Sequence, residues 1–331
     1  MDCAREQLER RLTDHLQFVY PDLDNGKLGD LISAITEIMR FNDYIADPEP
    51  HRNPWTQQDA IIITYGDTII ADDKLPLRTL REFLRDNFTG CVSSVHVLPF
   101  FPWSSDDGFS VIDYLAVDHS LGTWAELSAI AGDFLLMSDL VINHCSSHSQ
   151  WFENFKKGIS PGKDYFLEEK PDAVLHDVVR PRVSPLLRAT DTVEGVRHVW
   201  CTFSHDQIDL NFRNTKVLIE FIRIVRFYLD RGVKIFRLDA VAFLWKEVGT
   251  KCINLPQTHE LVRLFRTLIE YCDPEAIIIT ETNVPNIENL AYFGNGNETQ
   301  VIYNFSLPPL LLYTLASGDC SALRTWLASM P

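Results

Sequence analysis

The sequence lacks an apolar run of about 18 residues, the length that a helix needs to cross a bilayer. It also lacks a basic excess, because 46 acidic residues outnumber 30 basic ones and give a net charge of −16. Nucleic acids and anionic membranes attract basic surfaces, so neither is an expected partner. No secretory leader opens the chain, since no basic start followed by a short apolar stretch is present. These absences predict a cytoplasmic protein.

Paired cysteines are missing as well. The seven cysteines are odd in number, scattered, and never spaced as CxxC. Disulfide frameworks and structural zinc sites use even sets at short spacings, so we expect a reducing compartment and no metal. The chain has ordinary apolar (46%) and charged (23%) contents, and its 331 residues suit one large α/β barrel or two domains.

The chain divides into two regions by the spacing of its apolar residues. Residues 1–57 predict an N-terminal helical extension, because leucines recur at helical spacing in REQLERRLTDHLQFVY and LGDLISAITEIMR. Three prolines in PEPHRNPW then end that pattern. Residues 58–331 alternate apolar strands with amphipathic helices, and the helix 215–232 begins at an expected N-cap, Asn214. Six strands are expected, at 60–70, 93–101, 134–144, 233–240, 276–283 and 300–307.

This alternation predicts an α/β fold with a parallel sheet and right-handed crossovers. Polar residues end every strand, which favours a (β/α)8 barrel of the TIM type over an open sheet. About six of the eight strands are present, so the barrel is expected to be incomplete at the C-terminus. The stretch from about 145 to 204 is irregular and rich in Pro, Arg, His and Asp, and predicts an insertion.

Charged side chains end the fourth and fifth expected strands. Arg237 and Asp239 follow Val233, and Glu281 follows an isoleucine run. In a barrel these strand ends meet at one mouth, where two carboxylates about 5 Å apart form the pair of a retaining glycosidase. We expect Arg237 to lower the pKa of Asp239 and keep it ionised, while Glu281 holds a proton. Taken singly, the Arg–Asp pair is also consistent with a structural ion pair, and Glu281 with a helix cap.

Several motifs carry a resemblance to a known family. DLVINH (139–144), RLDA (237–240) and the strand end at Glu281 resemble, in order, the first three short motifs of the α-amylase superfamily. Longer signatures, among them HVLPFFPWSSDDGFSVIDY (96–114) and TFSHDQIDLN (202–211), resemble the sucrose phosphorylase subfamily. Two loops and the N-terminal helical segment look most like the glucosylglycerate phosphorylases within it.

The resemblance implies a retaining glucosyl phosphorylase, in which phosphate replaces water as the second nucleophile. It implies that Asp239 is the nucleophile, that Glu281 is the general acid and base, and that Arg237 holds the nucleophile. The irregular insertion would correspond to the family's B domain, and the rest of 58–331 to part of the catalytic barrel. The substrate-binding residues that it implies are Asp106 and His144 for the glucosyl hydroxyls, with Phe109 and Phe203 flanking the sugar.

The resemblance further implies that the enzyme uses no cofactor and no metal, and that its partners are an α-glucoside and phosphate. Phosphate needs cations, for which the insertion offers Arg180, Arg182 and Arg188; the alternative is that these are solvent-exposed loop residues. The family's third carboxylate follows a histidine, and no histidine follows Phe305. We therefore expect a C-terminally truncated chain that is inactive and poorly soluble on its own.

Two other functions stay open. One is an α-glucoside hydrolase or transglucosidase with the same two carboxylates, and the other is a non-catalytic sugar-binding remnant. The leaving group, whether glycerate, fructose or fructose phosphate, and assembly as a homodimer also stay open at this point.

Overall fold

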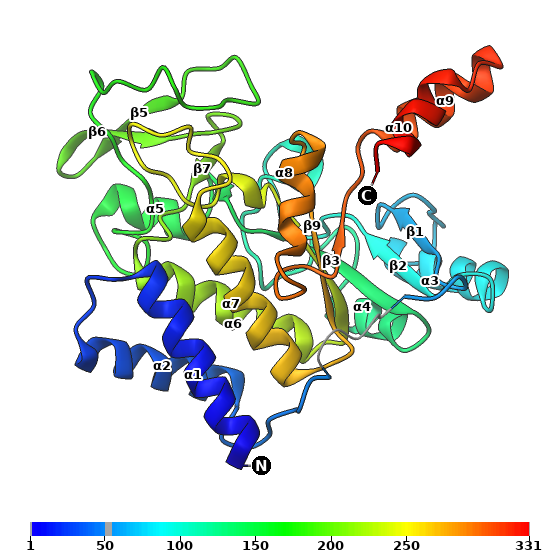
Figure 1. The fold of residues 1–331 in the computed structure, drawn as a ribbon, viewed down its shortest axis with the longest axis horizontal. Helices are drawn as coiled ribbons and strands as arrows, with labels where there is room; N and C mark the ends of the chain where they lie inside the picture. Colours follow the sequence, from blue (N-terminus) through cyan, green and yellow to red (C-terminus); the bar gives the residue numbers. More distant parts are fainter. Residues whose placement is uncertain (1, 50–54, 331) are drawn as a thin grey trace.

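A curled parallel sheet of six strands forms the centre of the protein (Figure 1). The structure is a computed structural model and describes residues 2–49 and 55–330. Sheet order β1-β2-β3-β8-β9-β10 follows chain order, and each neighbouring pair is parallel. All six expected strands are thereby confirmed. Their bounds are β1 Ile61–Thr64, β2 Ser94–Val97, β3 Leu135–Val141, β8 Val233–Asp239, β9 Ile277–Thr280 and β10 Val301–Ile302.

Helices cover the outer face of the sheet and supply the crossovers between strands (Figure 1). The expected N-cap of α6 is confirmed, since the Asn214 side chain accepts a hydrogen bond from the Lys216 amide at 3.0 Å. The helices are α1 Asp2–Val19, α2 Asn25–Met39, α3 Pro76–Phe88, α4 Trp124–Ala131, α6 Thr215–Leu229, α7 Pro256–Cys272, α8 Asn286–Leu290, α9 Leu307–Ser317 and α10 Ser321–Ala328.

Two apolar layers lie on either side of the sheet. The outer layer joins strand residues such as Leu140 and Phe236 to the helices. The inner layer is a separate, smaller cluster around Met137, Ile235 and Ile279. Successive strand residues alternate between faces, so Asp139, Arg237, Asp239 and Glu281 continue the inner rows toward the carboxyl ends of their strands. The list of inner residues is completed by Ile277, Trp55, Ile61, Val301 and Tyr303.

The two N-terminal helices pack against the outer helices α7 and α6 (Figure 1). Leucines of α1 are fully or almost fully buried there. His15 of α1 pairs through Nδ1 with Glu260 Oε1 of α7 at 2.5 Å, and the Tyr20 hydroxyl donates to the Phe212 carbonyl at 2.8 Å. The expected division into an extension and a barrel, with its boundary near residue 57, stays a prediction.

The segment between β3 and α6 holds more regular structure than the sequence indicates. It contains β4 His144–Ser146, α5 Gln150–Lys157, the hairpin β5 Leu187–Thr192 and β6 Gly195–Trp200, and β7 Gln207–Asp209. Ser149 caps α5 through its hydroxyl, and Phe152 packs edge-on against Phe166 at 5.0 Å between ring centroids. Elements this short show too few turns or alternations for periodicity to reveal them.

At the other end of the chain, α9 and α10 project away from the sheet (Figure 1). Neither helix buries a residue, and Leu312 (70% exposed) and Leu315 (83%) face solvent. Across the described residues, no helix combines the length and apolar character needed to cross a membrane.

Candidate active site

Arg237 joins the two carboxylates that the sequence singles out. It stands on β8 two residues before Asp239, and one guanidinium nitrogen, Nη1, donates to Asp239 Oδ1 at 2.8 Å and to Asp139 Oδ1. Its other terminal nitrogen lies 3.9 Å from Glu281 Oε1. Glu281 also accepts a hydrogen bond from the Ala240 amide at 3.3 Å. The structure thus brings Arg237, Asp239 and Glu281 together at the carboxyl ends of β8 and β9.

Aromatic rings enclose the same guanidinium. Its central carbon lies 5.4 Å from the Phe109 ring centroid and 5.2 Å from that of Tyr303. Burial disfavours the charged guanidinium, but Asp139, Asp239 and Glu281 outweigh it and raise the pKa of Arg237. Two rings and two hydrogen bonds fix the position of Arg237, so the Asp239 carboxylate is held at a defined place and angle.

Arg237 lowers the pKa of Asp239 as expected, but the expected net result, a fully ionised Asp239, is wrong. Burial is the largest influence and raises the pKa of Asp239 to about 7, with Glu281 and Asp139 adding to the rise against the lowering effect of Arg237. Arg237 does not serve Asp239 alone, because the nitrogen that pairs with Asp239 also pairs with Asp139. Asp239 therefore ionises at a higher pH than a free aspartate does.

A second cluster lies beside this pair. His144 Nε2 contacts the Phe109 carbonyl and the Gln207 amide nitrogen, each at 3.1 Å. The same amide nitrogen donates to Asp106 Oδ2 at 2.9 Å. Burial lowers the pKa of His144, so the ring is neutral at pH 7. The Phe203 ring lies 5.2 Å from that of His144. The structure therefore brings Asp106, Phe109, His144 and Phe203 together in one cluster.

A buried lysine, Lys246, is linked to this cluster through Asn143. Lys246 Nζ contacts Asp209 Oδ2 at 2.8 Å, Asn143 Oδ1 at 2.8 Å and the Phe243 carbonyl at 2.6 Å. The Asn143 amide nitrogen lies 3.3 Å from His144 Nδ1, which links the lysine to the site. Among the described residues, no group of three or more His, Cys, Asp or Glu side chains is arranged to hold a metal ion.

Sequence reasoning missed three contributors to the site: Gln207, Tyr303 and His96, whose Nε2 lies 2.8 Å from Asp139 Oδ2. His96 and Gln207 each lie within a motif quoted for the family resemblance, but no local pattern distinguishes them from neighbouring polar residues. The three insertion arginines differ in their surroundings. Arg188 donates to the His205 carbonyl and packs over the Phe152 ring, whereas Arg180 and Arg182 are exposed.

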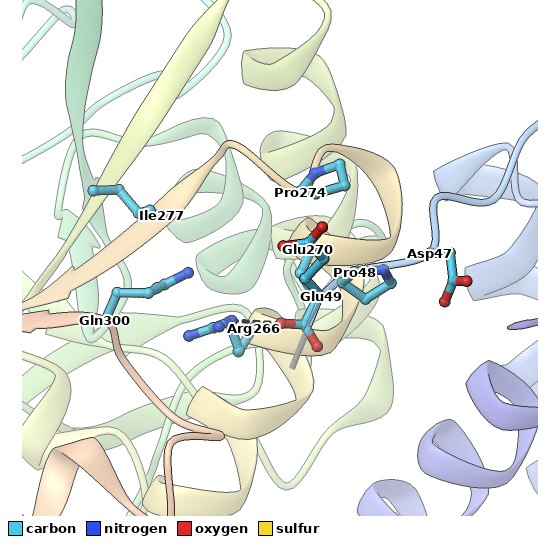
Figure 2. A pocket seen from close by; sticks show the side chains of 8 residues that line it. All are labelled: Asp47, Pro48, Glu49, Arg266, Glu270, Pro274, Ile277 and Gln300. Atoms are coloured by element: carbon cyan, nitrogen blue, oxygen red, sulfur yellow. Dashed lines mark hydrogen bonds and ion pairs between the residues drawn. The ribbon is translucent and has the colours of Figure 1, made fainter. Parts of the chain in front are cut away.

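A hollow of about 190 Å³ lies at the opposite end of the sheet. Figure 2 shows its lining, with Ile277 at the start of β9 and Gln300 just before β10. Two of its charged groups pair within the wall, since Arg266 Nε donates to Glu270 Oε2 at 2.7 Å. In (β/α) barrels chemistry collects at the carboxyl ends of the strands, so this hollow is not the candidate active site.

Comparison with known proteins places the chain in a family. The α-amylase catalytic domain matches residues 90–326. The chain belongs to the α-amylase family. It is similar to the sucrose 6F-phosphate phosphorylase from Thermoanaerobacter thermosaccharolyticum, with a TM-score of 0.73 and 27% identity over 84% of this chain and 58% of that one. The TIM-type barrel, here with six of its strands, is thereby confirmed as the fold.

The curated relatives fall into two groups, which differ in how similar their sequences are to this chain. A glucosylglycerate phosphorylase of Spirochaeta thermophila is 45% identical over 96% of this chain and 54% of its own length, and one of Escherichia coli is 39% identical over 96% and 57%. A sucrose phosphorylase of Agrobacterium vitis is 29% identical over 82% and 56%. The chain spans about half of the length of the curated relatives it matches.

Proposed function

We propose that this chain carries the nucleophile and the general acid of a retaining phosphorylase that acts on glucosylglycerate. The supporting observation is that the carboxylates of Asp239 and Glu281 both lie beside the Arg237 guanidinium. The choice of substrate is supported by sequence identity, which is 39–45% to glucosylglycerate phosphorylases and 29% to a sucrose phosphorylase. Tests of activity call for an enzyme of the relatives' length that contains residues 1–331, referred to below as the full-length enzyme.

In the first step the ionised Asp239 carboxylate attacks C1 of the glucosyl group. The bond between C1 and the leaving oxygen breaks, and Glu281 gives its proton to that oxygen. A covalent ester between C1 and Asp239 results, with inverted configuration. Arg237 supports this step because it fixes the attacking carboxylate by a 2.8 Å hydrogen bond.

In the second step phosphate attacks C1 on the side from which the leaving group departed. Glu281, now ionised, takes a proton from phosphate, the ester bond breaks, and Asp239 leaves as a carboxylate. The product is α-glucose 1-phosphate, and two inversions give net retention. Proposed contacts from Asp106 and His144 to the glucosyl hydroxyls hold the ring during both steps, with Phe109 and Phe203 beside it.

Phosphate and glycerate are both anions, whereas the protein carries a net charge of −16. Local cations must therefore offset repulsion at the acceptor side of the site. We propose the exposed Arg180 and Arg182 for this role. Arg188 is not proposed, because the His205 carbonyl and the Phe152 ring occupy its guanidinium.

We also propose that the enzyme works in the cytoplasm, where phosphate is abundant and thiols stay reduced. Cys145 and Cys201 are buried free thiols, which suits such a compartment. The chemistry of both steps needs only protein groups, the sugar and phosphate, so we propose that no cofactor takes part.

The direct test compares substrates in the full-length enzyme. Glucosylglycerate with phosphate should give α-glucose 1-phosphate at a higher kcat/KM than sucrose with phosphate. Release of free glucose at the same rate with and without phosphate would instead identify a hydrolase. A clear preference for sucrose would overturn the proposed substrate.

A further inference from the structure

Asp206, the residue before β7, accepts hydrogen bonds from four serine hydroxyls. Its Oδ2 accepts hydrogen bonds from Ser104 at 2.5 Å, from Ser105 at 2.5 Å and from Ser110 at 2.9 Å. Its Oδ1 accepts one from Ser147 at 2.6 Å. Burial disfavours the ionised carboxyl, but the hydroxyls outweigh it and lower the pKa of Asp206. These are charge-assisted hydrogen bonds, which are stronger than those between neutral groups.

Three of these serines bracket one turn, at residues 104–110. The turn contains Asp106 and Asp107, whose φ angles of 58° and 49° lie in the left-handed region, although neither residue is glycine. Such conformations are unfavourable for residues with a Cβ and persist where the surroundings hold them. Gly108 in the same turn has φ 103°, and a Cβ there would meet the Pro99 carbonyl oxygen at 2.8 Å. The turn is thus strained, and Asp206 binds both of its ends.

The turn carries groups of the proposed sugar site. Asp106 accepts a hydrogen bond from Gln207, the residue after Asp206. The Phe109 carbonyl contacts His144, and the Phe109 ring covers Arg237. The backbone carbonyl of Asp206 also accepts from the Ser110 hydroxyl at 3.0 Å and from the Ser147 amide at 2.8 Å. One residue therefore connects the turn, β4 and the segment before β7.

We propose that Asp206 is a positioning residue, whose carboxylate holds the strained 104–110 turn in the conformation that presents Asp106 to the glucosyl ring. The proposal rests on the proposed function, because it takes Asp106 as a ligand of the sugar. Asp206 touches no reacting atom. Its effect should therefore appear in the binding of the glucosyl group and should pass through Asp106.

The test is a double-mutant cycle in the full-length enzyme, with KM and kcat measured for the glucosyl substrate. Asp206→Asn replaces one accepting oxygen by an NH₂ group, which cannot accept from the serines. We expect KM to rise at least tenfold with kcat changed less than threefold, the pattern of binding lost equally in ground and transition states. In an Asp106→Asn background, Asp206→Asn should raise KM less than twofold further, since the group that it positions is already gone.

Two controls keep the result interpretable. Asp191→Asn, at an exposed aspartate of β5, should leave KM unchanged. Ser105→Ala removes one donor from the same carboxylate and serves as the second variant in the cycle if Asp206→Asn does not fold. A KM within twofold of wild type in a folded Asp206 variant, or in Ser105→Ala used in its place, would overturn the proposal, as would effects that add fully to those of Asp106→Asn.

Failure of the proposed function would look different. The cycle uses the glucosyl donor in whichever reaction the wild type catalyses, so it can be completed with glucose release as the signal. A wild type that releases glucose without phosphate contradicts the phosphorylase proposal and leaves the comparison of Asp206 variants intact. A full-length wild type that binds and cleaves no glucosyl compound would overturn both proposals.

Discussion

Replacing Lys246 by methionine should strongly destabilise the protein. The side chain of Lys246 is 2% exposed and that of Asp209 is fully buried, and their charges lie 2.8 Å apart. Methionine keeps the length of the chain but removes the ammonium, so the Asp209 carboxylate loses its buried counter-ion. Removing one partner of a buried ion pair costs about 3–5 kcal/mol of unfolding free energy. Asp209 then keeps its hydrogen bonds from the Thr202 amide and hydroxyl, neither of which carries a charge.

The assay is denaturant unfolding of the full-length enzyme, wild type against Lys246→Met, at several pH values. An unpaired buried carboxylate has a raised pKa in the folded state, so it binds a proton there that the unfolded state releases. The deficit of the variant should therefore be smallest at acid pH and should grow as the pH rises. Lys246→Met combined with Asp209→Asn should recover part of the loss, because no buried charge is then left alone.

Lys251→Met provides a matched control, because Lys251 is exposed in the same loop region. It should change the unfolding free energy by less than about 0.5 kcal/mol. A loss below about 1 kcal/mol for Lys246→Met, or a loss that does not depend on pH, would refute the reasoning that Lys246 neutralises Asp209.

Three further predictions concern the site and the chain as a whole. Glu281→Gln should slow cleavage of natural glucosides at least 100-fold but spare substrates with activated leaving groups, which need little protonation; equal losses on both would contradict its role as the acid. Because burial raises the pKa of Asp239 from 3.8 to about 7, its charge should destabilise the folded state as the pH rises through that range. The Asp239→Asn variant lacks this charge, so by pH 8 its unfolding free energy should exceed that of the wild type by up to about 4 kcal/mol. Denaturant unfolding of both proteins at pH 4 and pH 8 measures this difference. No gain at pH 8 would contradict the raised pKa of Asp239. Residues 1–331 alone should be poorly soluble and inactive, because α9 exposes apolar side chains and the edges of the sheet are unpaired, and a monodisperse active preparation would contradict this expectation.

The sheet could be predicted from the sequence because each strand carries a local signal. Short apolar runs such as that of β9 alternate with helices of clear 3.6-residue period, and chain order then fixes sheet order. The carboxyl ends of parallel strands meet at one edge, so the meeting of Arg237, Asp239 and Glu281 follows from three separate local patterns. Most strands came out shorter than predicted: β1, expected at 60–70, spans Ile61–Thr64, and β10, expected at 300–307, spans Val301–Ile302.

The electrostatics of the site could not be predicted in the same way. The sequence shows Arg237 two residues from Asp239, but the contact with Asp139, 98 residues away, is a tertiary one. The sequence also does not show how deeply Asp239 is buried, and this burial decides that its pKa is raised. The contacts of Gln207 and Lys246 could not be predicted either, because each is a single polar residue whose partner lies in a segment far away in the sequence.

Trapping the covalent intermediate tests the central claim most directly. A 2-fluoroglucosyl fluoride should react with the full-length enzyme, since fluoride leaves readily and the fluorine at C2 slows the second step. Peptide mass spectrometry should then place one fluoroglucosyl group on Asp239, and added phosphate should release it as the 1-phosphate. A label on another residue, no label at all in an enzyme that cleaves glucosides, or release by water at the same rate without phosphate would contradict the account.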